Sequence, residues 1–221
     1  MKTFITSLII ITTGFFTEIY GQKILTDVVL TYNISILSAK GEKQIGSALN
    51  GATLSLYLTK DKSRSEMVST PGTESNVFDN KLGKGFILKE YSGQKLMITT
   101  TADNWAQKNL VNSKLNFDID NSLVVIAGYN CKKATAISAD GKTYTVYFDP
   151  SYSLINKSYN NAFPQLQGLP VQYELASGNL IFKYLLTNLN NAAINASKFE
   201  APKSGFRIMT YAENQQLKKG E

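Results

Sequence analysis

The single cysteine is the first residue to consider for chemistry, because a thiolate can act as a nucleophile. Cys131 is followed by Lys132 and Lys133, and cationic neighbours can lower the pKa of a thiol. In a strand, however, adjacent side chains face opposite ways, so Lys132 would point away from Cys131. The chain also contains no histidine to act as the base. We therefore predict that Cys131 is a small buried apolar residue.

Two alternating aspartates resemble the opening of a calcium-binding loop. Asp118 and Asp120 are followed by Ser122, and alternating oxygen ligands can converge on one ion. The EF-hand pattern also requires Gly at its sixth position and Glu at its twelfth, where this chain has Leu123 and Tyr129. The match fails, so we predict exposed aspartates that lead into a strand, and no metal site.

No pair of carboxylates stands out as a glycosidase site, which needs two acids facing each other across a cleft. Glu174, between Tyr173 and Leu175, is the most plausible partly buried acid. A structural ion pair with a lysine on a neighbouring strand would account for an acid at this position equally well. The sequence has no GxSxG, HExxH or P-loop motif. Without histidine, His-based triads and the usual zinc sites are excluded. We predict a protein that is not an enzyme, with no catalytic residues and no cofactor.

Composition places the chain among globular proteins. Of its 221 residues, 43% are hydrophobic and 18% are charged, a balance unlike that of a disordered chain. The formal net charge is +6, but the basic residues are mostly lysines scattered along the sequence. A nucleic-acid surface would concentrate them in a stripe with aromatic residues between them, so we expect no nucleic-acid partner.

The first 21 residues have the layout of a secretory signal peptide. Lys2 precedes an apolar run of about 13 residues, Phe4 to Phe16, and Gly21 is a small residue suited to cleavage. The run is shorter than the roughly 20 apolar residues of a membrane-spanning helix. We predict a signal peptide over residues 1–21, a single domain over residues 22–221, no transmembrane span, and a location in the periplasm or at the outer-membrane periphery.

Two-residue periodicity dominates the rest of the chain. Apolar and polar residues alternate from Val28 to Ile36 and from Leu54 to Leu58, as in strands with one buried face. Four turn signals separate strand-like runs and predict hairpins: Asn50-Gly51, Ser92-Gly93, Asp140-Gly141 and Ser177-Gly178. Hairpins without alternating long helices favour an antiparallel sheet. We predict a mainly β (α+β) fold: a single curved antiparallel sheet or half-barrel with a few short helices.

Helices are expected at only a few places. Asp103 is a candidate N-cap for a two-turn helix that contains Trp105 and Leu110. A second short helix is predicted within residues 151–163. Residues 190–199 fit either a helical turn or a loop.

One predicted strand is apolar on both faces. Between Leu180 and Leu186 the only charged residue is Lys183, and such a strand must be covered on both sides, by helices or by a bound apolar ligand. Aromatic side chains on a concave sheet would form an apolar pocket with polar tips at its rim, although ordinary core filling explains them as well. The candidate ligand-binding residues are Trp105, Tyr147, Phe182, Tyr184 and Leu186.

Three motifs in the second half of the chain resemble exported Bacteroidota proteins of unknown function. The first extends from Ile126 to Ala134 and precedes a hairpin that ends at Tyr147. The second, from Leu166 to Glu174, occupies the place of the signature that names the GLPGLI family, with Val-Gln-Tyr in place of Gly-Leu-Ile after the proline. The third, from Phe199 to Phe206, resembles the ending of the same domains. The resemblance is therefore to proteins related to the GLPGLI family.

This group is similar in architecture to LolA and to the LppX-like proteins. The resemblance implies a curved antiparallel half-barrel whose short helices cover an apolar cavity, and it carries over no catalytic residues. We therefore expect a non-enzymatic exported envelope protein that binds a lipid or other apolar ligand in the concave face of its sheet. The alternative is a cell-envelope scaffold or assembly subunit that docks a protein partner. The expected partners are thus a lipid, a lipoprotein or an envelope protein.

Overall fold

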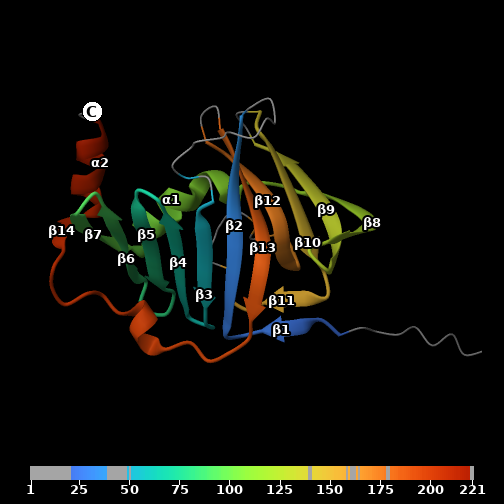
Figure 1. Cartoon of the computed structure of the whole chain (residues 1–221), viewed down its shortest axis with the longest axis horizontal. Coiled ribbons are helices and arrows are strands. Elements are labelled where there is room, and N and C mark those ends of the chain that lie inside the picture. Colours follow the sequence, from blue (N-terminus) through green and yellow to red (C-terminus); the bar gives the residue numbers. More distant parts are fainter. Residues whose placement is uncertain are drawn as a thin grey trace, which may run out of the picture.

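The computed structural model describes residues 21–38, 49, 51–138, 141–157, 159, 163, 165–177 and 180–219. In this part of the chain, one large sheet contains 12 strands in the order β14-β7-β6-β5-β4-β3-β2-β13-β12-β10-β9-β8. The sheet is curved and open, and it forms most of the molecule (Figure 1). The predicted fold class, a mostly antiparallel curved sheet with short helices, is confirmed.

Two meanders make up the sheet. The first contains β2 (Val28–Ser38), β3 (Thr53–Leu58), β4 (Lys62–Ser69), β5 (Gly72–Asp79), β6 (Lys84–Tyr91) and β7 (Gln94–Thr101). The second contains β8 (Asp118–Ile126), β9 (Tyr129–Ile137) and β10 (Thr143–Asp149). The hairpin of β12 (Leu169–Ser177) and β13 (Leu180–Asn190) joins them, because β12 pairs with β10 and β13 pairs with β2.

Three shorter strands complete the architecture. The edge strand β14 (Arg207–Thr210) pairs with β7 in parallel, whereas every other pair in the large sheet is antiparallel. A separate parallel pair joins β1 (Lys23–Leu25) to β11 (Tyr152–Leu154). The helix predicted within residues 151–163 is therefore replaced, over residues 152–154, by a strand. Its partner β1 lies 127 residues or more away in the sequence, and local patterning does not reveal such a pairing.

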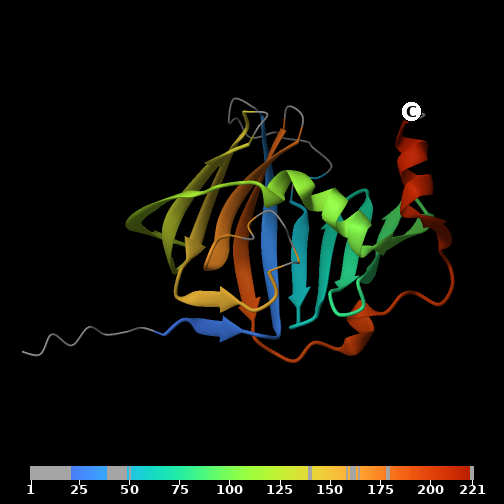
Figure 2. The same cartoon turned by 180° about the vertical axis from the view of Figure 1, so that it is seen from behind.

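Helix α1 (Ala102–Ser113) connects β7 to β8 and crosses one face of the sheet, as Figure 2 shows. The predicted helix is confirmed, but its cap is not Asp103. The backbone N–H of Asn104 donates to Thr101 Oγ1, and the N–H of Thr101 donates to Asn104 Oδ1. This reciprocal pair satisfies backbone donors at the start of the helix, and Asp103 lies in its first turn.

We call the face covered by α1 the inner face and the opposite face the outer face. Alternation along β2 places Leu30, Tyr32, Ile34 and Ile36 on the inner face, and each is at most 3% exposed. Leu30 and Tyr32 belong to the main apolar cluster of the core. The outer face, which is toward the viewer in Figure 1, is half-buried where β13 crosses the middle of the sheet. The sequence predicts that residues 180–186 are covered on both sides, and this prediction is wrong, because most of these residues are only half-buried.

A second apolar cluster lies on the outer face, over β5 to β7. The segment 191–206, which we call the strap, leads from β13 to β14 and includes the short helix η1 (Ala196–Phe199). Phe199 of the strap packs against Val77, Phe86, Leu88 and Met97. Residues 190–199, for which the sequence fits either a helical turn or a loop, thus contain both: β13 ends at Asn190, and a single helical turn follows at Ala196–Phe199. The chain finishes in α2 (Tyr211–Lys219), which packs against β7 and β14.

The predicted turn at Ser92-Gly93 is confirmed, because both residues have positive φ, 51° and 80°, as a type I′ hairpin requires. Ala127 and Gly128 form a second turn of this kind between β8 and β9, with φ of 50° and 84°. Asn50, Asp140 and Gly178 lie outside the described residues, as does the expected signal peptide before Gly21. Among the described residues, no helix combines the length and hydropathy needed to cross a membrane.

Candidate ligand cavity

A cavity of about 270 Å³ lies between α1 and the inner face of the sheet. Helix α1 contributes Trp105 and Lys108, and five strands contribute most of the remaining lining. The lining side chains are Leu54, Leu56, Ser65, Asn76, Trp105, Lys108, Tyr159, Tyr173, Leu175 and Tyr184. The volume is slightly below the range of about 300 to 1,000 Å³ that is usual for small-molecule sites. The cavity therefore fits a compact ligand or a single chain.

A group of tyrosines forms the apolar side of the cavity. Tyr173 on β12 is opposite Tyr184 on β13 in the antiparallel register, and their rings stack with centroids 4.6 Å apart and planes 12° apart. Tyr32 meets Tyr173 edge-on at 5.5 Å, and its hydroxyl donates to the carbonyl oxygen of Pro170 at 2.8 Å. These contacts fix the orientation of the two rings that face the cavity.

Trp105 is held by β5. Its ring stacks on Phe78, with centroids 4.7 Å apart and planes 9° apart, and the residue is 7% exposed. One helical turn later, Lys108 Nζ lies 5.3 Å from the centroid of the Trp105 ring and donates to Asn76 Oδ1. Residues three apart on a helix share a face, so α1 directs both side chains toward β5.

Burial raises the pKa values of the tyrosine hydroxyls in the cavity further above neutral pH. Removal from water disfavours the phenolate, so burial raises the pKa of Tyr184 to about 12. Burial also raises the pKa values of Tyr159 and Tyr173, and the neighbouring Tyr32 and Tyr184 add to the effect at Tyr173. At neutral pH, each hydroxyl in the cavity is therefore an uncharged group that can donate or accept a hydrogen bond.

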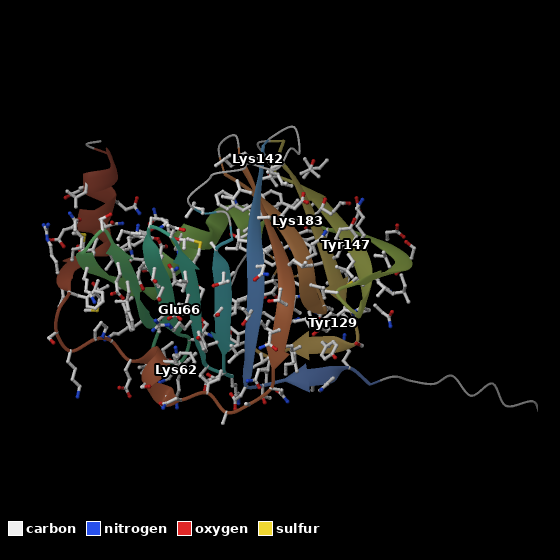
Figure 3. All side chains as sticks on the ribbon, in the orientation of Figure 1. Lys62, Glu66, Tyr129, Lys142, Tyr147 and Lys183 are labelled. Carbon is white, nitrogen blue, oxygen red and sulfur yellow. The ribbon has the colours of Figure 1, made fainter. Side chains whose placement is uncertain are left out.

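The five candidate residues lie in three different places. Trp105 and Tyr184 line the cavity together. Phe182 and Leu186 share the inner face with Tyr184 by alternation, but Leu186 is in the main core, 1% exposed, and neither lines the cavity. Tyr147 lies on the outer face, because it pairs with Lys133 and Gln172 while its neighbours Val146 and Phe148 are buried. Figure 3 labels Tyr147 and Lys183, which share this outer face.

The polar side of the cavity was not predicted from the sequence. Ser65 on β4 is directly opposite Asn76 on β5, and Lys108 lies beside Asn76. In the sequence, Ser65 and Asn76 are polar residues in segments where apolar and polar residues alternate only weakly. Nothing in the sequence therefore assigns them to the inner face of the sheet. The signal that could have found Lys108 is its spacing of three from the single tryptophan on a predicted helix.

The chemically suggestive residues of the sequence have structural roles. Cys131 is fully buried, and burial raises the pKa of its thiol to about 11. Asp118 and Asp120 are exposed at the start of β8, where Asp120 Oδ1 accepts a hydrogen bond from the N–H of Ser122. Glu174 lies opposite Lys183 on β13, as the cross-strand explanation required. No group of His, Cys, Asp and Glu able to hold a metal ion occurs among the described residues.

Comparison with solved structures shows a shared fold at low sequence identity. An uncharacterised conserved protein from Thermus thermophilus matches with a TM-score of 0.51 and 8% identity, over 84% of this chain and 91% of that one. PNGF-II matches with a TM-score of 0.50 and 12% identity, over 87% of this chain. The present chain spans about a third of the length of PNGF-II, since the match covers 33% of it.

More distant structural neighbours include a LolA superfamily protein from Nitrosomonas europaea and the Mycobacterium tuberculosis lipoprotein LppX. The LolA superfamily protein matches with a TM-score of 0.39 and 6% identity over 80% of this chain and 91% of that one. LppX matches with a TM-score of 0.37 and 9% identity over 75% and 88%. No protein-family model and no curated protein sequence matches the chain, so the relation to the GLPGLI family stays a prediction.

Proposed function

We propose that this protein is a non-enzymatic, exported envelope protein that binds a lipid or another apolar ligand between α1 and the inner face of its sheet. The observation that carries the proposal is the cavity of about 270 Å³, whose lining combines Leu54, Leu56 and Leu175 with the stacked Tyr173 and Tyr184 rings. Apolar surface removed from water stabilises a bound chain by about 0.8 kcal/mol per methylene group. The signal-like residues 1–21 support export to the periplasm or the outer-membrane periphery.

The proposal treats the cavity as a binding site and not as a catalytic one. Among the described residues, the side chains that line it include no carboxylate, cysteine or histidine, so this part of the lining offers neither a thiolate nor a carboxylate base. The one thiol of the chain, Cys131, lies in the core with a raised pKa. These observations support binding without turnover.

Native mass spectrometry of the protein purified from the envelope of its own host tests the proposal. We expect a reproducible adduct that is extracted into organic solvent and is lost in Tyr184→Glu, which places a charge in the cavity. Tyr147→Glu is the matched control, since it makes the same change on the outer face and should keep the adduct. A clean mass for the unmodified protein, or equal loss of adduct from both variants, would contradict the proposal.

A second candidate function, docking of an envelope protein, is favoured by β8. This strand is at one edge of the large sheet, and its apolar side chains are open to solvent: Leu123 is 64% exposed and Val125 is 69% exposed. An open edge offers unpaired backbone groups to an added strand. Crosslinking in host envelopes from a photoreactive residue at position 125, compared with one at the exposed position 82, would test this role. Capture of one protein from position 125 alone would support it, and identical patterns would contradict it.

A further inference from the structure

The polar groups that line the cavity under α1 share one property: they supply hydrogen-bond donors. Lysine is donor-only, the amide nitrogen of asparagine carries two N–H groups, and serine and tyrosine hydroxyls donate as well as accept. No Asp or Glu lines the cavity, and Lys108 is its one charged side chain among the described residues. Such a set of donors is complementary to an anionic group that accepts hydrogen bonds.

Ser65, Asn76 and Lys108 lie toward one end of the cavity, and the stacked tyrosine rings lie toward the other. Ser65 and Asn76 are adjacent on β4 and β5, and the ammonium group of Lys108 reaches Asn76 from α1. The stacked rings of Tyr173 and Tyr184 belong to β12 and β13, on the far side of β2 and β3 in the strand order. A ligand that fills the cavity would therefore have one polar end and one apolar end.

Two donors next to Lys108 have no hydrogen-bond partner in the described part of the chain. Ser65 Oγ takes part in no hydrogen bond there, and Asn76 uses its side-chain oxygen for Lys108 while its side-chain nitrogen donates to nothing. Both side chains line the cavity. Both donors are therefore available to a ligand that brings acceptor oxygens into the cavity.

We propose that the cavity binds a single-chain amphiphile with an anionic head group. The head group is held by Lys108, Asn76 and Ser65, and the chain lies against Tyr173 and Tyr184. This inference rests on the proposed function and adds the chemical class of the ligand. The volume of about 270 Å³ suits one chain and not the two chains of a diacyl lipid. Charge-assisted hydrogen bonds from the ammonium group to the head group supply the selectivity.

Binding of three twelve-carbon probes to the full mature chain tests the inference. Dodecanoate and dodecyl phosphate carry an anionic head group, and dodecan-1-ol has the same chain without the charge. The single Trp105 lines the cavity, so its fluorescence reports each titration. We expect both anions to bind about tenfold more tightly than the alcohol at low salt, and this preference should shrink in high salt, which screens the exposed ammonium group. Preference for only one anion would identify that head group as the cognate one and would still support the inference.

Substitutions of lysine separate a head-group contact from a structural effect. Lys108→Gln should weaken binding of the anions about tenfold and leave dodecan-1-ol unchanged, and Lys108→Arg should retain the preference. Lys183→Gln removes the same charge on the outer face and should change nothing. Equal affinity of wild-type protein for the alcohol and the anions, or equal loss of all three in Lys108→Gln, would overturn the inference and leave the proposed function standing. Failure of all three probes to bind would count against both.

Discussion

Arg64 on β4 donates from Nη1 to the backbone carbonyl oxygen of Lys198, 3.0 Å away and 134 residues later in the chain. The same guanidinium group donates to Ser75 Oγ at 3.0 Å and pairs with the Glu66 carboxylate. Lys198 Nζ in turn lies 4.7 Å from the centroid of the Tyr57 ring. Glu66 is labelled on β4 in Figure 3, on the outer face near η1. This polar group therefore attaches the strap to the outer face beside the apolar contact made by Phe199.

Removing the guanidinium group should loosen the strap. Arg64→Met loses the hydrogen bonds to Lys198, Ser75 and Glu66, and hydrogen bonds to charged groups contribute about 1.5 to 3 kcal/mol. We expect a loss of about 1 to 3 kcal/mol in the free energy of unfolding and faster amide exchange over residues 194–200. Arg207→Met is the control, because Arg207 is exposed. Equal effects of the two substitutions in urea unfolding would show that the contact to Lys198 contributes nothing.

Because the rings of Tyr173 and Tyr184 stack, we expect stability to depend on an aromatic ring at position 184. Tyr184→Phe keeps the ring and should change stability little, whereas Tyr184→Leu loses the aromatic pair, which contributes about 0.5 to 1.5 kcal/mol beyond area burial. Urea unfolding of the two variants at neutral pH measures the difference. Equal stability of the Phe and Leu variants would mean that the stacking geometry is incidental.

Gly85 is required by a close approach between β5 and β6. A Cβ atom at this position would lie 2.2 Å from the carbonyl oxygen of Val77 and 2.8 Å from the Phe78 ring. Gly85→Ala should therefore cost about 1 to 3 kcal/mol, as other overpacked substitutions do. Since Phe78 stacks on the only tryptophan, the fluorescence of Trp105 should shift as well.

The matched control for Gly85 is Gly93. Gly93 has a φ of 80° and nothing within 4 Å of an added Cβ, and asparagine tolerates this left-handed conformation. Gly93→Asn should therefore stay within about 0.5 kcal/mol of wild type and leave the Trp105 spectrum unchanged. A Gly85→Ala variant as stable as Gly93→Asn would contradict the packing of β5 on β6.

Alternation along single strands was readable from sequence because it depends only on neighbouring residues. Alternation places Tyr184, Phe182 and Leu186 on one face of β13, and the turn at Ser92-Gly93 follows from local chemistry as well. Which face becomes the inner one is decided by the whole topology. Tyr147 was expected in the cavity and lies on the outer face, because it alternates with Val146 and Phe148, whose side chains are buried on the other face.

The cavity itself required the fold. It joins Ser65 and Asn76 of the first meander and Lys108 of the crossover helix to Tyr173 and Tyr184 of the later β12–β13 hairpin. No local pattern brings these segments together. By contrast, the motif Thr210-x-x-Glu213 is a capping box that could have been read directly as the start of α2.

That capping box makes α2 sensitive to acid. The Glu213 carboxylate accepts hydrogen bonds from the N–H of Thr210 at 2.7 Å and from its hydroxyl at 2.8 Å, and these bonds lower the pKa of Glu213. The stabilisation is thus present above the ordinary pKa of the carboxyl group and is lost as the pH falls through the lowered value. Amide protection in residues 211–219 should therefore fall on acidification in wild type and be low at every pH in Glu213→Ala. Identical pH profiles for the two proteins would contradict this role.

The buried thiol predicts a loss of stability in alkali. Burial raises the pKa of Cys131 from 9.0 to about 11, so between these values the unfolded chain releases a proton that the folded chain retains. The wild type should therefore lose stability relative to Cys131→Ala as the pH rises from 9 to 11, by up to about 2 to 3 kcal/mol at 1.36 kcal/mol per pKa unit. The tyrosines titrate in the same pH range, but their contribution to the pH dependence of stability is common to both proteins and cancels in the comparison. Urea unfolding from pH 7 to 11 measures the difference, and iodoacetamide should alkylate the folded protein slowly at pH 8. A constant difference up to pH 11, or rapid alkylation of the folded protein at pH 8, would place the thiol in water instead of the core.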